Sequence, residues 1–161
     1  MIRLAPDRLA YPARASARLL APDHGGGAMG TGRPHRIQIV EDDYFIGMQI
    51  EDALAAAGYE IVGIAPDRRE AIALAGRTTP DLVLMDIRLA RGSDGVETAI
   101  ELRRRYGLRC VFVTAHADAG TRARADPAQP LGWVTKPFTP ATLVGIVKAA
   151  LAADDGGEDV T

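Results

Sequence analysis

Acidic, hydroxyl and ammonium side chains follow four short apolar runs of this 161-residue sequence. The runs end at Glu41-Asp42-Asp43, at Asp86, at Thr114 and at Lys136. A carboxylate can act as a nucleophile and form an acyl phosphate, while an ammonium group and a hydroxyl group can hold phosphoryl oxygens. Because phosphoryl transfer depends mostly on positioning and charge neutralisation, these groups would nearly suffice for it if the fold brought them together.

The same acids indicate a metal. Carboxylates gathered in one place repel one another, and a counter-charge is needed to keep them ionised at neutral pH. Hard oxygen ligands around a small cavity suit Mg²⁺, which keeps several waters and commonly bridges to a substrate phosphate. The sequence therefore predicts a Mg²⁺ site, whereas His24, His35 and His116 have no metal-ligand spacing and predict no zinc site.

The elements that must position these residues are those of a parallel α/β sheet. From Arg36 onward, short apolar runs alternate with segments of helix length, which is typical of βαβ units. The predicted strands are residues 37–40, 61–65, 82–85, 110–113 and 133–135. Right-handed crossovers place helices on both faces of such a sheet. Its ligand site lies at the carboxyl ends of the strands, so the polar residues above are expected to meet at one edge.

The helix boundaries carry their own signals. The second helix is predicted to open at Asp67 and the third at Asp94, each with Glu three residues later. The last helix opens with Thr139 as N-cap and is expected to end near Ala153. The fourth, within residues 118–126, has little apolar surface and contains glycine, so a short or mobile helix is expected.

The sequence divides into three parts. Residues 1–34 lack any sustained period and are expected to be a flexible extension, residues 35–153 form the predicted α/β domain, and residues 154–161 form an acidic disordered tail. The Arg-rich opening is similar to an organelle transit peptide, although its prolines break any long amphipathic helix. Met29, just ahead of the first strand, is an alternative start.

Composition narrows the function classes. Hydrophobic residues make up 47% and charged residues 25%, which is typical of a soluble globular domain. The net charge of -2 gives no reason to expect nucleic acid or a membrane surface as a partner, and no apolar run approaches the roughly 20 residues that span a bilayer. The one cysteine, Cys110, lies in an apolar run, which favours a core position and a reducing, cytoplasmic compartment.

Each candidate residue alone also has a purely structural explanation. The acids at 41–43 could cap the first helix and favour its dipole. Thr114 could be an ordinary residue at a strand end, and Lys136 a solvated charge. Their joint occurrence at one sheet edge, in the order acid, Asp, Thr, Lys, favours a phosphoryl site over these separate explanations.

Five segments of the chain resemble the receiver domains of two-component response regulators. They are residues 39–43, 84–89, 94–95, 113–115 and 133–138, and the resemblance spans Arg36 to about Leu151. It implies a flavodoxin-like, doubly wound sheet of five parallel strands in the order 2-1-3-4-5. It also implies a regulatory phosphoacceptor in a phosphorelay, rather than an enzyme that turns over external substrates.

The resemblance assigns the nucleophile and the metal ligands. Asp86 is implied to be the phosphorylated residue, and Asp42 and Asp86 bind Mg²⁺ directly. Glu41 occupies the other acidic position and acts through water, whereas Asp43 caps the helix that follows. The backbone carbonyl of Arg88 is the remaining protein ligand.

The resemblance also assigns the residues around the acceptor. Thr114 is the switch hydroxyl, Lys136 holds a phosphoryl oxygen, and the bond between Lys136 and Pro137 is expected to be cis. Trp133 occupies the aromatic switch position, where the family more often has Tyr or Phe. Arg88 and His116, each two residues beyond a site residue, are predicted to tune the lifetime of the phosphate.

Partners and rival functions follow from the same resemblance. The donor would be a histidine kinase or a phosphotransfer protein, and the output a protein effector, because too few residues follow Leu151 for a helix-turn-helix. A homodimer through the fourth helix, fifth strand and fifth helix is also allowed. A phosphatase with an aspartyl nucleophile would need a second Asp where Arg88 stands. The remaining alternative is a constitutive protein-interaction module with a receiver fold.

Overall fold

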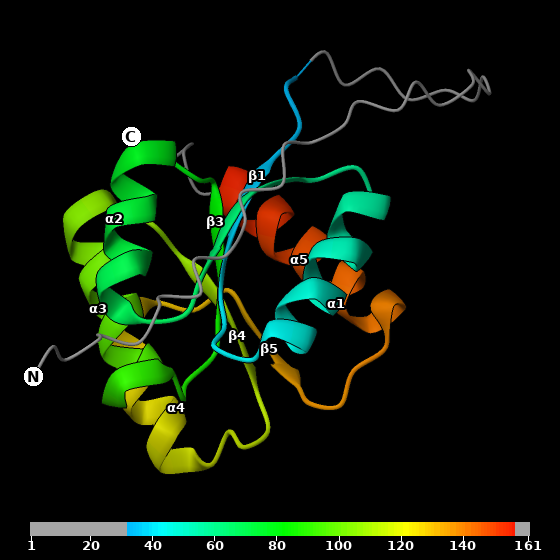
Figure 1. Ribbon diagram of the computed structural model, residues 1–161. Helices are drawn as coiled ribbons and strands as arrows, with labels where there is room; N and C mark the ends of the chain where they lie inside the picture. The colour runs from blue at the N-terminus through cyan, green and yellow to red at the C-terminus, as the bar shows by residue number, and fades with distance from the viewer. Residues whose placement is uncertain (1–31, 157–161) are drawn as a thin grey trace, which may run out of the picture. The chain divides into compact units, whose positions relative to one another are not determined.

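A parallel sheet of five strands organises the computed structural model, which describes residues 32–156 (Figure 1). The strands are β1 (Arg36–Val40), β2 (Glu60–Ala65), β3 (Leu82–Met85), β4 (Cys110–Thr114) and β5 (Gly132–Thr135). Their order is β2-β1-β3-β4-β5, and every pairing is parallel. The predicted strand order is therefore confirmed.

Helices cover both faces of the sheet, as the crossover rule requires. Figure 1 shows α1 (Tyr44–Ala56) and α5 (Pro140–Asp155) on one side, and α2 (Arg68–Thr78), α3 (Gly95–Tyr106) and α4 (Ala119–Ala125) on the other. Two single-turn 3₁₀ helices, η1 (Ala90–Gly92) and η2 (Asp126–Ala128), complete the set. Among the described residues, no helix is long and apolar enough to cross a membrane.

Burial on both faces explains the continuous apolar runs of the central strands. In β1, Ile37 and Ile39 pack in the core beneath α1 and α5, while Val40 packs in the core beneath α2 and α3. All four residues of β3 and all five of β4 are buried. The strand ends are therefore anchored from both sides, which fixes the positions of the residues that follow them.

Side chains cap all five α-helices. Asp43, Asp67, Asp94, Asp118 and Thr139 each accept a hydrogen bond from a backbone N–H two or three residues further on. Each cap satisfies a donor that the first helical turn leaves without an intrahelical partner. The helix starts expected from the sequence are confirmed, including the cap assigned to Asp43.

The end of the last helix differs from expectation. Helix α5 continues to Asp155, beyond the expected end near Ala153, and Asp154 forms an ion pair of 3.0 Å with Arg109. Asp154 thus belongs to the helix and not to the tail. The transit-like opening, the Met29 alternative and the end of the tail lie outside the described residues, so the three-part division stays a prediction.

Helix α4 is short, as expected. It has seven residues, of which only Ala125 is buried, and η2 follows it directly. A helix this short, with so little apolar surface, is held in place mainly by the polar contacts that its side chains make.

Replacement of Gly95 tests how closely α3 approaches the loop after β3. A Cβ at Gly95 would lie 1.8 Å from the backbone oxygen of Asp86, so we expect Gly95→Ala to lower the free energy of unfolding by about 3 kcal/mol. Gly145→Ala, at an exposed position of α5 with open space around it, is the matched control and should raise stability by about 0.5 to 1 kcal/mol. Urea unfolding measures both, and equal midpoints would contradict the close approach.

Candidate functional site

The carboxyl ends of β1, β3, β4 and β5 bring the predicted residues to one edge of the sheet. Val40 pairs with Met85, so the next residues, Glu41 and Asp86, leave neighbouring strands side by side. Thr114 ends β4, and Lys136 follows β5 and donates its backbone N–H to the Thr114 carbonyl at 2.9 Å. Parallel register alone therefore gathers the site.

Lys136 is the central cation of this site. Its Nζ donates to Oε2 of Glu41 at 2.8 Å and to Oδ2 of Asp86 at 3.2 Å. The Glu41 side chain is only 2% exposed, and those of Asp86 and Lys136 are 10% and 16% exposed. The peptide bond between Lys136 and Pro137 is cis, as expected.

Burial and charge shift the acid–base properties of this pair. Burial raises the pKa of Glu41 to about 7, because the hydrogen bond from Lys136 only partly offsets desolvation and the negative charge of Asp86 adds to the rise. Burial lowers the pKa of Lys136, but its hydrogen bond to Glu41 and the charge of Asp86 outweigh this effect and leave that pKa raised. The site therefore favours a bound proton or another cation beside Glu41.

A third carboxylate makes this cluster suitable for a divalent cation. Oxygen atoms of Glu41, Asp42 and Asp86 lie within 4.8 Å of one another, and Asp42 is exposed while the other two are buried. Three hard oxygen donors around one partly solvated point match the ligand preference of Mg²⁺. One ammonium group cannot balance three ionised acids, so the charge of the cluster also fits the ion.

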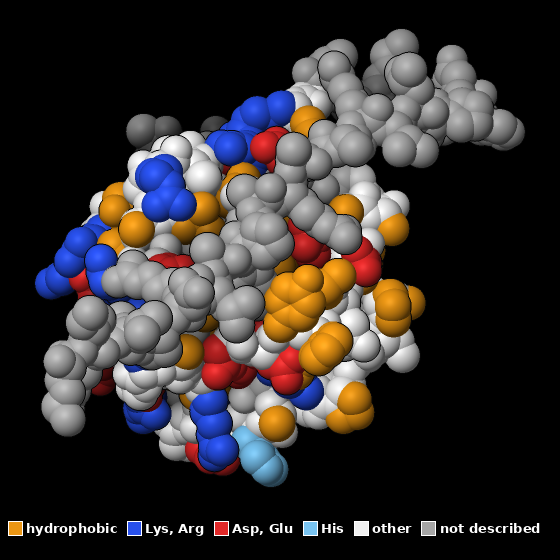
Figure 2. Space-filling view, viewed as in Figure 1, with side chains coloured by type: hydrophobic (Ala, Val, Ile, Leu, Met, Phe, Trp, Pro, Cys, Tyr) orange, Lys and Arg blue, Asp and Glu red, His pale blue; other side chains and the backbone are white. Residues whose placement is uncertain are grey.

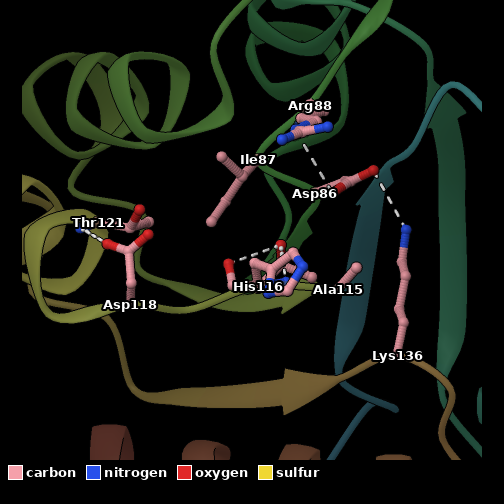
Figure 3. A pocket seen from close by; sticks show the side chains of 9 residues that line it. Asp86, Ile87, Arg88, Ala115, His116, Asp118, Thr121 and Lys136 are labelled. Carbon is pink, nitrogen blue, oxygen red and sulfur yellow. Dashed lines mark hydrogen bonds and ion pairs between the residues drawn. The ribbon is translucent and has the colours of Figure 1, made fainter.

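A pocket of about 210 Å³ opens beside Asp86 (Figure 3). Its lining residues are Asp86, Ile87, Arg88, Thr114, Ala115, His116, Asp118, Thr121 and Lys136. Oδ1 of Asp86 accepts the backbone N–H of Arg88 at 3.4 Å, and its other oxygen faces Lys136. Asp86, the Thr114 hydroxyl, the Lys136 ammonium group and both expected tuning residues thus share one cavity.

Thr114 and Trp133 lie in different surroundings. The Thr114 hydroxyl donates to the backbone oxygen of His116 at 3.2 Å, so it is held within the β4–α4 loop at the pocket wall. Trp133 does not line the pocket. Its ring stacks on Phe112 with centroids 4.7 Å apart, and the guanidinium carbon of Arg122 lies 4.6 Å from its centroid.

Sequence reasoning missed residues at both ends of α4. Asp118 and Thr121, at its start, line the pocket opposite the loop that follows Asp86, and Arg124, near its end, forms an ion pair of 2.5 Å with Asp94. Asp is a preferred N-cap residue, so the sequence offered a signal for Asp118. In the structure its side chain accepts the backbone N–H of Thr121 at 2.8 Å. Nothing in the sequence pairs Arg124 with a residue 30 positions away.

The surface at the carboxyl ends of the strands carries charged side chains (Figure 1 and Figure 2). On the face shown in Figure 2, charged side chains and a histidine gather at the lower end of the molecule, where the strands end in Figure 1. Hydrophobic side chains are also exposed on this face (Figure 2). Helix α1 begins two residues after Asp42, and in its first turn Phe45 is 78% exposed and Tyr44 is 45% exposed.

Comparison with protein families identifies the class to which this fold and site belong. Residues 37–148 match the model of the response regulator receiver domain, so the chain belongs to the family of response regulator receiver domains of two-component systems. The resemblance drawn from the sequence is confirmed. The match covers all five strands except Arg36, the first residue of β1, and it ends within α5.

The curated relatives are longer proteins. The chain is 35% identical over 119 residues to the transcriptional regulatory protein PdtaR of Mycobacterium tuberculosis, covering 74% of this chain and 58% of that protein. It is 31% identical over 131 residues to the phyllosphere-induced regulator PhyR of Methylorubrum extorquens, covering 80% of this chain and 48% of PhyR. The chain thus spans about half the length of these relatives.

Solved structures match the fold over nearly their full length. The signal receiver domain of a modulated diguanylate cyclase from Desulfovibrio desulfuricans superposes with a TM-score of 0.72 at 31% identity, covering 78% of this chain and 99% of that one. A CheY-like receiver domain protein from Methanospirillum hungatei gives 0.70 at 27% identity, covering 76% and 98%.

The raised pKa of Glu41 predicts how stability depends on pH when divalent cations are removed. A carboxyl group whose pKa is 4.5 when unfolded and about 7 when folded stabilises the fold fully below pH 4.5 and loses that contribution as pH rises through 7. Glu41→Gln cannot ionise, so we expect it to become more stable than the wild type across this window. The difference should be on the order of 1 to 2 kcal/mol after solvent screening.

Urea unfolding in EDTA at pH 5 and pH 8 measures this difference. Asp52→Asn, on the exposed surface of α1, is the control and should show no such dependence on pH. If the stability of the wild type relative to Glu41→Gln does not fall as pH rises, Glu41 is ionised throughout and the raised pKa is contradicted.

Proposed function

We propose that this chain is the phosphoryl-accepting receiver of a phosphorelay and that Asp86 is the acceptor. One observation supports this proposal above all. Lys136 Nζ bridges Asp86 and Glu41 at 3.2 and 2.8 Å, with Asp42 in the same acidic cluster, at the mouth of a cavity large enough for a phosphoryl group. We take residues 35–153 as the domain that performs this function.

The proposed reaction moves one phosphoryl group between two nucleophiles. An oxygen of Asp86 attacks the phosphorus of a phosphohistidine donor, the P–N bond breaks, and its electron pair returns to the imidazole nitrogen. The ammonium group of Lys136 then offsets the negative charge of a phosphoryl oxygen, where before it offset that of the free carboxylate. The Thr114 hydroxyl donates a hydrogen bond to another phosphoryl oxygen. Hydrolysis reverses the attachment when water attacks phosphorus and Asp86 leaves as carboxylate.

We propose Mg²⁺ as the cofactor of this reaction. Asp42 and Asp86 would hold it directly, Glu41 through water, and the backbone carbonyl of Arg88 would complete the protein ligands. When bound, the ion supplies the positive charge that offsets the acids and the incoming phosphoryl oxygens. The exposed position of Asp42 leaves that side open to the waters that Mg²⁺ retains.

We further propose that phosphorylation changes a protein-binding surface. The new charge beside Glu41 draws Thr114 inward, and Trp133 on β5 is the aromatic residue that responds. The affected face would be α4, β5 and α5, which could contact a protein effector or a second copy of the chain. The donor would be a histidine kinase or a phosphotransfer protein. The chain itself would catalyse only its own phosphorylation and slow dephosphorylation.

Phosphorylation by a small donor tests the acceptor. With acetyl phosphate and Mg²⁺, we expect the intact protein to gain the mass of one phosphoryl group, because the pocket already holds the nucleophile and its cation. Asp86→Asn should gain none, and EDTA should prevent the gain in the wild type. Intact-mass spectrometry and peptide mapping measure the outcome.

The acetyl phosphate experiment and a fluorescence titration together separate the main proposal from its alternative. A constitutive interaction module with this fold would take no phosphoryl group from acetyl phosphate. Its Trp133 fluorescence would also stay unchanged when beryllofluoride and Mg²⁺ are added. Phosphorylation of Asp86→Asn to the wild-type level would place the acceptor elsewhere.

Arg88 and His116 should set the lifetime of the acyl phosphate. Both line the pocket beside Asp86, so truncation to Ala opens the phosphorus to water, and we expect Arg88→Ala and His116→Ala each to shorten the lifetime by several-fold. Loss of label from the purified, phosphorylated protein gives the rate, and Arg69→Ala on the exposed surface of α2 is the control. Unchanged lifetimes in both variants would contradict the tuning role.

A further inference from the structure

Two arginines hold α4 in place where an apolar face would normally do so. The helix buries only Ala125. Arg122 lies against the ring of Trp133 on β5 and donates to the backbone oxygen of Ala117 at 3.2 Å. Arg124 donates to Oδ2 of Asp94 at 2.5 Å. One arginine thus ties the helix to β5, and the other ties it to the start of α3.

Asp94 is itself fixed to the loop that carries the nucleophile. Its Oδ1 caps α3, which leaves Oδ2 for Arg124. Its backbone pairs with Arg88 in an isolated antiparallel bridge, and the next residue, Gly95, donates to the backbone oxygen of Ile87 at 2.7 Å. The ion pair with Arg124 therefore connects α4 to the residues that directly follow Asp86.

This connection spans the pocket. Asp118 and Thr121, at the start of α4, lie on one side of the cavity, while Ile87 and Arg88 lie on the other (Figure 3). The position of α4 relative to the nucleophile loop sets the width of the space beside Asp86. Arg124 and Asp94 lie outside the pocket lining, and their ion pair connects α4 to the residue whose backbone pairs with Arg88.

We propose that Arg124 is a positioning residue for the chemistry of Asp86: its ion pair with Asp94 holds α4 as the wall that limits access of water to the phosphoryl group. This inference rests on the proposed function, since it concerns the lifetime of the acyl phosphate. Arg124 does not line the pocket and acts only through the placement of Asp118 and Thr121.

The exposure of the pair separates this role from a role in global stability. The Arg124 side chain is 52% exposed and that of Asp94 is 32% exposed, and ion pairs of this kind contribute little to the stability of a fold. Loss of the pair should therefore leave the unfolding midpoint nearly unchanged while α4 gains freedom to move away from the nucleophile loop.

A double-mutant cycle on the phosphate lifetime tests the proposal. Arg124→Ala removes the cation, and Asp94→Asn removes the anion but keeps a good helix cap. We expect each variant, phosphorylated with acetyl phosphate and Mg²⁺, to lose the phosphoryl group about threefold faster than the wild type, the order expected for one half-exposed ion pair. The double variant should be no faster than either single variant, because both remove the same contact.

Control variants distinguish the loss of this ion pair from the loss of any surface cation and from a general loss of stability. Arg69→Ala, on the exposed surface of α2, should keep the wild-type lifetime, and Arg124→Lys, which keeps a cation, should recover part of it. Thermal unfolding of each variant identifies any general loss of stability.

Three outcomes would overturn the inference. Wild-type lifetimes in Arg124→Ala and Asp94→Asn would show that the pair does not limit hydrolysis, although the proposed function would stand. Effects that add in the double variant would show that the two residues act separately. A wild-type chain that accepts no phosphoryl group would reject the proposed function itself, and the inference with it.

Discussion

One ammonium group set against three carboxylates is the interaction on which the rest of this site depends. Lys136 contacts Glu41 and Asp86, and Asp42 lies in the same cluster, so the apo site carries more negative charge than its one cation can offset. Burial raises the pKa of Glu41 to about 7, and the negative charge of Asp86 adds to this rise. The site is therefore poised to take up positive charge. A divalent ion and the developing charge of a phosphoryl group can be accommodated together because the cation relieves a repulsion that the fold has already built in.

The fold maintains this unfavourable arrangement through the burial of its strands. Acids that repel one another would separate if their backbones could move, but β1 and β3 are packed on both faces by apolar side chains and paired with each other along their length. The energy that holds Glu41 beside Asp86 thus comes from the two cores, at a distance from the charges. Helix α4, in contrast, has little apolar burial to hold it. It buries one alanine and is held by arginine contacts. The molecule combines a rigid wall that carries Asp86 with a weakly held wall across the pocket, and a local change of charge can move the second far more easily than the first.

Sequence reasoning succeeded where one physical rule fixed the outcome. Strands buried on both faces give continuous apolar runs, and parallel register carries residues 41, 86, 114 and 136 to one edge, so the sheet and the lysine-centred cluster were predictable. It failed where a long side chain spans two elements. The contacts of Arg122 with Trp133 and of Arg124 with Asp94 depend on where α4 settles in three dimensions, and a seven-residue helix has no periodic pattern that fixes its orientation. The expected end of α5 near Ala153 was wrong for the same reason, because Asp154 pairs with Arg109, which is distant in sequence.

Trp133, which we propose as the aromatic switch residue, illustrates how these tertiary contacts bear on movement of a side chain. Its ring stacks on Phe112 and lies beneath Arg122, so any rotation of the indole must give up both interactions. An aromatic pair contributes about 0.5 to 1.5 kcal/mol beyond its buried area, and a cation–π contact at the surface about 0.5 to 1 kcal/mol. Their sum is comparable to the few kcal/mol that separate two states of a conformational equilibrium. The bulk of tryptophan therefore does not forbid movement. It ties the movement to α4, because Arg122 and Arg124 lie on the same short helix: a displacement that frees the indole also strains the ion pair with Asp94, and through it the loop that carries Asp86.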